Sequence, residues 1–418
     1  IYEIDNFTQI LIQLQNTYSI NTQNTVKSSI YYTLADGWWN FDVDNYYGFN
    51  STGLNVSTNK INSHLIGFFT NHIWKNKKLT FITGLHANNY NNHFTESDAN
   101  SDIIYNQVNR LKDEFSAFQK IEYKLNQVLL TTDIQIRQAL FDYESDYMDF
   151  KTIKWYFFNP KIGLSWNTQN IGLAYINIGR TGREPAKYDM FQGNDVLIYL
   201  CETDENFNPI NIPNMGNDLI NSIEPEYVTD LELGFRKNYN TGSININYYY
   251  LNFDNERVLN GAYGPSGLAL TSNVEKSIRT GFELFGELNI FPNLKLINNS
   301  SFNHSVITQQ NTDFTPILTP QIIINQEFIY SLNNFNFCIS TRYQSESYIN
   351  FENSAKLDDY ILINARIDYK FKKYFASIFI NNLTDNYYFN NGVVNLYGDK
   401  SYFVQAPRNF YISLKYEF

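Results

Sequence analysis

The sequence predicts an all-β protein, a transmembrane antiparallel β-barrel, from three observations. Apolar and polar residues alternate over segments of ten or more residues, which is the period of a β-strand. The connections between these segments alternate between short turns and long loops, the pattern of outer-membrane barrels. The chain ends on an apolar alternation that closes with the aromatic residue Phe418.

Aromatic side chains are abundant in a chain that is not strongly apolar. The 418 residues include 33 Tyr, 33 Phe and 5 Trp, yet only 43% of the residues are hydrophobic. No apolar run is long enough to cross a membrane as a helix. A barrel strand needs an apolar residue only at every second position to face lipid. The composition alone therefore fits either a membrane barrel or a soluble β protein.

The charge balance and the cysteine count exclude some classes of protein. Acidic residues outnumber basic residues by 42 to 31, for a formal net charge of −11, and no basic stripe with interleaved aromatic residues occurs. Nucleic acid is therefore not an expected partner. The cysteines are Cys201 and Cys338; we expect one in a loop and one in a strand, without a disulfide between them.

Residues 360–371 show the alternation most clearly. One face carries Ile361, Ile363, Ala365, Ile367, Tyr369 and Phe371, and the other carries Asn364, Arg366, Asp368 and Lys370. Residues 128–140, 227–236 and 278–288 repeat the pattern, with charged residues on one face in each. A dry core does not tolerate so many charges, so the charged face is expected to line a wet interior.

The same parity assigns individual side chains to the two faces. Residues expected to face lipid are Ile361, Ile363, Ile367, Phe282, Leu284, Phe410, Ile412 and Leu414. Residues expected to face the interior are Arg366, Asp368, Arg279, Glu283, Asp230 and Glu232.

The alternation predicts about 17 strands along the chain. They lie near 8–19, 25–35, 59–73, 79–91, 112–124, 127–142, 153–167, 170–179, 224–239, 242–255, 271–289, 294–308, 317–332, 334–346, 356–371, 374–384 and 408–418. Short turns join them near residues 21–24, 75–78, 125–126, 167–169, 240–241, 291–293, 333 and 372–373. Long loops are predicted at 36–58, 92–111, 143–152, 180–223, 256–270, 309–316, 347–355 and 385–407. A sandwich or propeller does not require such strict alternation, and the short turns are expected on the periplasmic side.

Four segments, in order along the chain, resemble the TonB-dependent receptor family in its Bacteroidota-like form. Residues 178–191 read IGRTGREPAKYDMF, and residues 224–236 read EPEYVTDLELGFR. Residues 273–287 contain an Arg-x-Gly-x-Glu strand, and residues 380–388 read INNLTDNYY before the closing strand. The resemblance covers about the C-terminal 60% of the chain; the upstream hairpins agree by topology and composition.

The resemblance implies a fold and a function. Family barrels have 22 strands and an N-terminal plug, and they import a solute with energy from the TonB–ExbB–ExbD complex across the outer membrane of a Gram-negative bacterium. On this comparison, residues 1–418 form a partial barrel domain of about 17 strands, and the plug and first strands are expected to be absent, since bacterial barrels close with an even number. The implied ligand is a ferric siderophore or a similar iron complex.

Two groups of residues are candidate sites. Arg183, Glu184, Arg279 and Glu283 are candidates for facing the interior or the plug; pairing between neighbouring strands is the alternative to ligand contact. Trp38, Trp39, Tyr46 and Tyr47 are expected in the extracellular loop 36–58. They either pack within that loop or capture the ligand.

The sequence contains no recognisable catalytic or metal-binding motif. The histidines, at 64, 72, 86, 93 and 304, lack the spacing of a metal site. No nucleophile elbow or phosphate-binding glycine loop occurs. We therefore expect no enzyme activity, no cofactor and no metal site. Two alternatives to the importer remain: a passive porin-like channel, and an adhesion or enzyme barrel.

Overall fold

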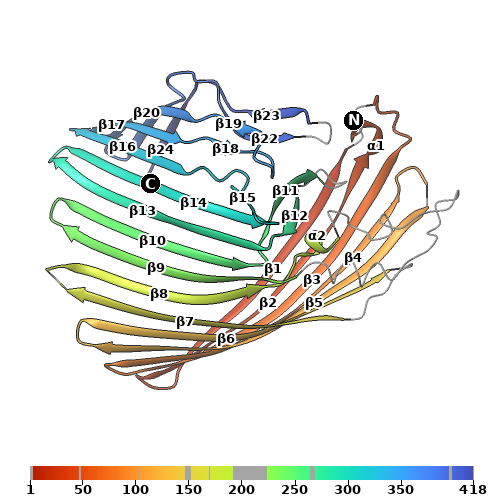
Figure 1. Cartoon of the computed structure of the whole chain (residues 1–418), viewed down its shortest axis with the longest axis horizontal. Coiled ribbons are helices and arrows are strands. Elements are labelled where there is room, and N and C mark those ends of the chain that lie inside the picture. Colours follow the sequence, from red (N-terminus) through yellow and green to blue (C-terminus); the bar gives the residue numbers. More distant parts are fainter. Residues whose placement is uncertain are drawn as a thin grey trace. The chain divides into compact units, whose positions relative to one another are not determined.

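The computed structural model describes residues 3–46, 49–101, 103–145, 152–168, 170–191, 224–263, 269–394 and 398–417. The chain divides into two compact units. Unit 1 comprises Ile1–Leu125, Thr131–Lys161 and Thr181–Pro225, and unit 2 comprises Asn126–Leu130, Ile162–Arg180 and Glu226–Phe418. Long antiparallel strands that follow one another in sequence lie side by side in each unit (Figure 1).

The principal strands follow the chain in hairpins. They are β1 (Asp5–Ser19), β2 (Asn24–Asp42), β3 (Val56–Lys75), β4 (Leu79–Asp98), β5 (Ile104–Leu125), β6 (Val128–Ser145), β7 (Ile153–Thr168), β8 (Gly172–Arg183), β9 (Glu226–Tyr239), β10 (Gly242–Asp254), β13 (Lys276–Phe291), β14 (Leu294–Gln309), β16 (Ile322–Leu332), β17 (Phe335–Gln344), β20 (Tyr360–Phe371), β21 (Tyr374–Asn381) and β24 (Asn409–Tyr416). Shorter strands are β11 (Arg257–Tyr263), β12 (Ala269–Asn273), β15 (Thr312–Phe314), β18 (Ser347–Tyr348), β19 (Lys356–Leu357), β22 (Phe389–Val394) and β23 (Lys400–Val404). The helices among the described residues are α1 (Val43–Tyr46) and α2 (Lys187–Met190).

The predicted all-β class and strand count are confirmed. The main sheet has 18 strands; without the three-residue β15, the remaining 17 correspond one to one with the predicted strands. Neighbouring strands in the described part of the chain pair antiparallel, as between β2 and β3 or between β13 and β14. Among the residues that the structure describes, no helix is long and apolar enough to cross a membrane.

The predicted short turns are also confirmed, except that residue 169 of the predicted turn 167–169 lies outside the described residues. Positive φ angles occur at Asn126 (52°), Asn333 (52°) and Lys372 (55°), each in a turn between neighbouring strands. Tight hairpin turns require positive φ, and Asn adopts it more readily than most residues. The Asn residues at these positions therefore match the turn geometry.

Several strands extend further into the predicted loops than the sequence indicated. β2 continues to Asp42, whereas residues 36–58 were predicted to be a loop, and β4 and β5 together occupy most of the predicted loop 92–111. These extensions mix aromatic, apolar and polar residues without the regular apolar alternation that identifies a strand. Backbone pairing holds them instead, since Trp38 and Trp39 lie opposite Lys60 and Asn59 in a continuous register.

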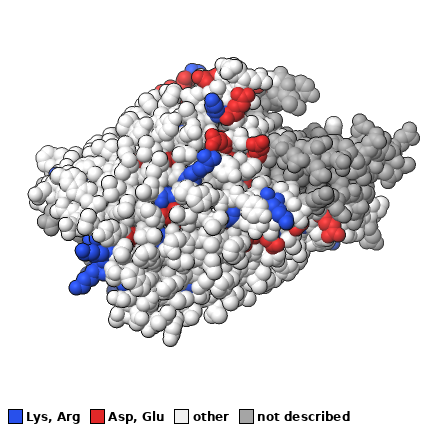
Figure 2. Space-filling view, turned by 60° about the horizontal axis from the view of Figure 1, so that its bottom comes forward, with Lys and Arg blue, Asp and Glu red and all other residues white. Residues whose placement is uncertain are grey.

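Apolar side chains are exposed on one face of the strands. Exposed members of the predicted set are Ile361, Ile367, Phe282, Phe410, Ile412 and Leu414, whereas Ile363 and Leu284 are half-buried. Figure 2 shows broad areas of one face that carry no Lys, Arg, Asp or Glu. Exposed apolar side chains that share one face of neighbouring strands mark an interaction surface.

Charged residues on the opposite parity pair with one another. Arg366 Nε donates to Asp368 at 3.0 Å, and Ser377 Oγ donates to the other carboxylate oxygen of Asp368 at 2.7 Å. Arg279 contacts Glu256 at 2.5 Å. Arg366 and Asp368 lie on the same strand, β20, and Ser377 joins them from the neighbouring β21. Glu256 lies in the connection that precedes β11. The charged face therefore carries polar contacts both along and between strands.

Glycines opposite aromatic residues allow close approach between strands. Gly234 lies under the ring of Tyr175, Gly67 lies opposite Tyr31, and a Cβ at either glycine would overlap the ring. Gly281 lies opposite Tyr249 in the same way. Glycine at these positions thus permits the close approach of a neighbouring side chain.

We expect Gly234→Ala to destabilise the protein by about 1–3 kcal/mol, because the Tyr175 ring must move away from the added methyl group. The movement also disturbs the hydrogen bond from Tyr175 Oη to Asn247, which is 3.3 Å long. Gly286→Ala is the control, because nothing lies within 4 Å of a Cβ at that position. Denaturant unfolding of the detergent-solubilised protein measures both; equal effects would contradict the packing argument.

Candidate functional site

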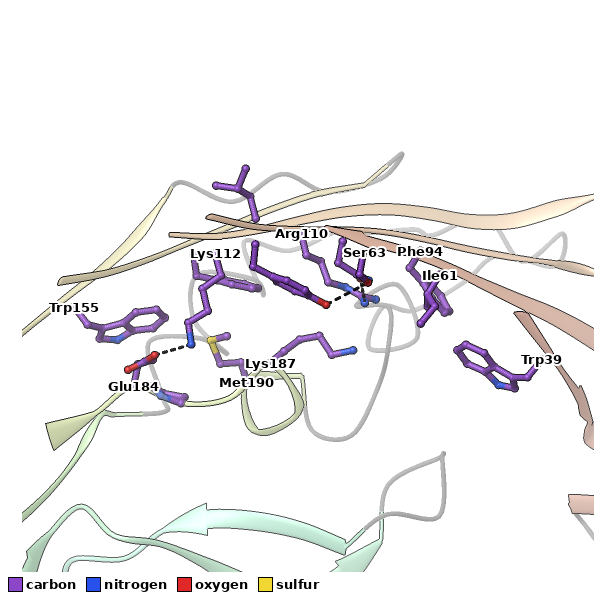
Figure 3. A pocket seen from close by; sticks show the side chains of 15 residues that line it. Trp39, Ile61, Ser63, Phe94, Arg110, Lys112, Trp155, Glu184, Lys187 and Met190 are labelled. Atoms are coloured by element: carbon purple, nitrogen blue, oxygen red, sulfur yellow. Dashed lines mark hydrogen bonds and ion pairs between the residues drawn. The ribbon is translucent and has the colours of Figure 1, made fainter. Parts of the chain in front are cut away.

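A pocket of about 350 Å³ lies on the polar face of unit 1. Its lining comes from β2 to β7 and from residues 184–191, which follow β8. We call residues 184–191 the return segment, because they fold back against β4, β5 and β6. Figure 3 shows side chains from the strands on one side of the pocket and those of the return segment on the other.

Aromatic side chains form much of the pocket wall. Trp39 and Phe94 are neighbours, with ring centroids 6.2 Å apart, and Trp155 lies at a separate part of the lining (Figure 3). Phe94 is 1% exposed and belongs to a buried cluster with Met190 and other apolar residues. Rings of this kind present large, rigid contact surfaces to a ligand.

A buried polar network crosses the strands beside these rings. Arg110 Nη1 donates to Asn92 at 2.9 Å, and Asn92 Nδ2 donates to Ser63 at 2.5 Å. The Arg110 guanidinium also lies 5.0 Å from the centre of the Phe94 ring. Arg110, Asn92 and Ser63 are all buried, so their orientations are fixed before any ligand arrives.

The return segment is attached to the strands by Glu184. Lys112 Nζ lies 2.6 Å from Glu184 Oε1, and Arg137 donates to Glu184 Oε2. We call Lys112, Arg137 and Glu184 the clamp. Burial alone would raise the pKa of Glu184, but the hydrogen bond and charge of Lys112 and the hydrogen bond from Arg137 outweigh it and hold the pKa below its ordinary value. The carboxylate is therefore ionised at neutral pH.

The clamp continues into a ladder of polar contacts on the neighbouring strands. Arg137 Nε lies 3.3 Å from Glu114, and His86 Nδ1 lies 3.7 Å from the other oxygen of Glu114. His86 Nε2 is hydrogen-bonded to Tyr31 Oη at 2.8 Å. The ladder therefore links the return segment to β2 through β4, β5 and β6.

The aromatic residues predicted as ligand contacts have different positions. Trp39 lines the pocket, whereas Trp38, its neighbour in β2, points to the opposite face of the strand. The prediction that both lie in a loop was wrong, because β2 extends to Asp42. Tyr46 ends α1, and Tyr47 lies outside the described residues.

The charged residues predicted to face the interior fall in both units. Glu184 lines the pocket, and Arg183 is the last residue of β8. In unit 2, Arg279 pairs with Glu256, and Glu283 accepts a hydrogen bond from Asn247 at 3.4 Å. Of the predicted residues whose side chains the structure describes, Glu184 and Trp39 line this pocket.

The sequence interpretation missed Arg110, Lys112, Trp155 and Met190 as pocket residues. Strand parity could have placed Lys112 on the polar face of β5. Its contact with Glu184 could not be predicted in this way, because it depends on how the return segment folds. Among the described residues, no group of three or more His, Cys, Asp or Glu side chains is placed to hold a metal ion.

Comparisons with known proteins identify the fold. The family model described as TonB dependent receptor-like, beta-barrel, matches residues 2–383. A search of curated protein sequences finds no match.

Solved structures share the architecture at low sequence identity. The copper transporter OprC has a TM-score of 0.78 and 14% identity, over 99% of this chain and 65% of OprC. The unliganded ferric citrate transporter FecA has a TM-score of 0.73 and 12% identity, over 100% of this chain and 62% of FecA. The ferric yersiniabactin uptake receptor FyuA from Yersinia pestis has a TM-score of 0.69 and 11% identity, over 99% of this chain and 62% of FyuA.

The chain thus spans 62–65% of the length of these solved structures. Its all-antiparallel sheet, the short turns and the match across residues 2–383 agree with one another. The chain belongs to the TonB-dependent receptor-like β-barrel family.

Proposed function

We propose that this chain is the barrel part of an outer-membrane receptor of a Gram-negative bacterium that imports a ferric siderophore or a similar iron complex. The family match over residues 2–383 carries the proposal. The titles of similar structures name uptake of ferric yersiniabactin and ferric citrate, and also copper transport. Two of these three solutes are iron complexes, which favours that class.

The pocket supports binding of one part of such a solute. A cavity of about 350 Å³ lies at the lower end of the range for small-molecule sites, which is roughly 300–1,000 Å³. It therefore suits one arm of an iron complex rather than the whole. Its rings and buried polar groups supply contact area and directed hydrogen bonds.

The exposed apolar face supports the location. Phe282 of β13 is 54% exposed and Ile361 of β20 is 51% exposed, on strands that pair with a neighbour on each side. Lipid is the partner we propose for this face, because alternating strands meet lipid with one parity and a wet interior with the other.

Energy for import is proposed to come from the TonB–ExbB–ExbD complex, as the family resemblance implies. Import in cells is then expected to depend on that complex. Uptake of radioactive iron complex by cells with and without TonB tests this; equal uptake in the two strains would contradict energy coupling.

Binding to the detergent-solubilised chain tests the solute class. Ferric citrate, a ferric tris-catecholate complex and Cu²⁺ are titrated while tryptophan fluorescence is recorded. Saturable binding of an iron complex supports the proposal. If the chain binds only Cu²⁺, the proposed solute would be a metal ion instead of an iron complex. Steady conductance in planar bilayers without saturable binding would favour the porin-like channel.

Trp39→Ala is expected to weaken the binding of that iron complex by about tenfold or more, since a buried tryptophan contact is commonly worth about 2 kcal/mol. Trp38→Ala is the matched control, because Trp38 is the adjacent residue and points to the other face of β2. Equal losses in the two variants would show that the pocket is not the binding site.

A further inference from the structure

The return segment is attached to the strands at both ends. At its C-terminal end, Met190 and Phe191 are 1% and 0% exposed. The Phe191 ring meets Tyr143 edge-on, with centroids 5.0 Å apart. At its N-terminal end, the clamp holds Glu184. The residues between these ends supply one wall of the pocket, including Lys187.

The two attachments differ in how strictly they fix the segment. Apolar packing is less directional than hydrogen bonding, so the Phe191 end fixes the position of the segment more than its direction. Both carboxylate oxygens of Glu184 have a cationic partner, Lys112 on one and Arg137 on the other. Charge-assisted bonds to both oxygens fix the orientation of a carboxylate as well as its position. The clamp is therefore the attachment that sets the direction of the return segment.

Arg137 has a distinct place in the clamp. It is not among the residues that line the pocket, whereas Glu184 and Lys112 are. Its side chain is 15% exposed and lies between Glu184 and Glu114, with the guanidinium 5.1 Å from the centre of the Phe157 ring. Arg137 is thus anchored to β5 and β7 while it holds the return segment.

We propose that Arg137 is a positioning residue for the solute-binding pocket: it acts through Glu184 to hold the return segment in place as the pocket wall. This inference rests on the proposed function for its effect on binding. Its structural part, that Arg137 holds residues 184–191, stands apart from any solute.

Hydrogen exchange of the full chain in detergent tests the structural part. In Arg137→Met, the backbone amides of residues 184–191 are expected to exchange about tenfold faster or more, because the segment loses a charge-assisted hydrogen bond to the Glu184 carboxylate. Arg137→Lys keeps the charge but loses the fork of donors, and is expected to recover part of the protection. If Arg137→Met does not fold, the comparison of Arg137→Lys with wild type carries the test.

Binding of the ferric tris-catecholate complex and of ferric citrate is measured on the same variants. We expect Arg137→Met to weaken whichever complex the wild type binds by about tenfold, in step with the exchange rate. Lys295→Met is the control, since it removes another ion pair, Lys295 with Glu287 at 2.7 Å, and should alter neither measurement.

The outcomes separate the two proposals. Unchanged exchange at residues 184–191 in Arg137→Met overturns the positioning role. Faster exchange with unchanged affinity also overturns it, because the wall would then not govern binding. If the wild type binds neither complex, the proposed function fails, and the exchange rates still decide whether Arg137 holds the return segment.

Discussion

Phe94→Ala is expected to destabilise unit 1 by about 3–5 kcal/mol, the usual loss when a buried phenylalanine is truncated in a packed core. Phe94 is 1% exposed and packs in one cluster with Val108, Phe141 and Met190. The truncation leaves a cavity that β-strand backbones cannot close, because cross-strand pairing fixes their spacing. It also removes the ring that lies against the Arg110 guanidinium.

Unfolding of the solubilised protein in guanidinium chloride measures this loss. The control is Phe49→Ala, because Phe49 is 69% exposed and its truncation should cost less than about 0.5 kcal/mol. Similar midpoints for wild type and Phe94→Ala would mean that the cluster beside the pocket does not contribute to stability.

Ile363→Arg is expected to destabilise the protein in a bilayer by about 2–4 kcal/mol if the residue lies near the midplane. Ile363 lies in β20 opposite Thr341 of β17, on the parity that carries the exposed Ile361 and Ile367. An arginine there must displace lipid contacts and has no acidic partner on the same face in the described register. The expected loss therefore depends directly on the proposed membrane location.

Ser340→Arg provides the matched control on the polar face. Ser340 lies opposite Glu327 in the pairing of β16 with β17, so a new arginine meets a carboxylate and should change stability by less than about 1 kcal/mol. Folding into lipid vesicles, followed by the gel mobility of unheated samples, compares the two variants. Equal tolerance of arginine at both positions would argue against lipid on the Ile363 face.

Local sequence patterns were sufficient to predict most of the fold. Alternation in residues 360–371 identified β20 and its two faces, and Asn126 and Asn333 marked turns that require positive φ. The ends of several strands were missed, because β2 beyond Asp36 mixes aromatic and polar residues without a regular alternation and is held by backbone pairing. Backbone hydrogen bonds leave no signature in side-chain chemistry.

The candidate site was less predictable than the fold. The family-like segment at residues 178–191 drew attention to Glu184, and the aromatic content drew attention to Trp39. Neither observation shows that Glu184 meets Lys112 and Arg137, since those contacts require the return segment to fold back across three strands. Contacts of this kind depend on the tertiary path of a loop, which a period of two does not encode.

The glycines beneath aromatic rings have a consequence for assembly. A strand that slips by one residue exposes the wrong face and is rejected by the solvent or the lipid. A slip by two residues keeps both faces correct, so alternation alone does not oppose it. Such a slip between β2 and β3 would bring the Tyr31 ring against Leu65 or Phe69 instead of Gly67. The Tyr31 ring fits over Gly67 but would clash with a larger residue. This contact therefore favours the native register over slips by two residues while the strands pair.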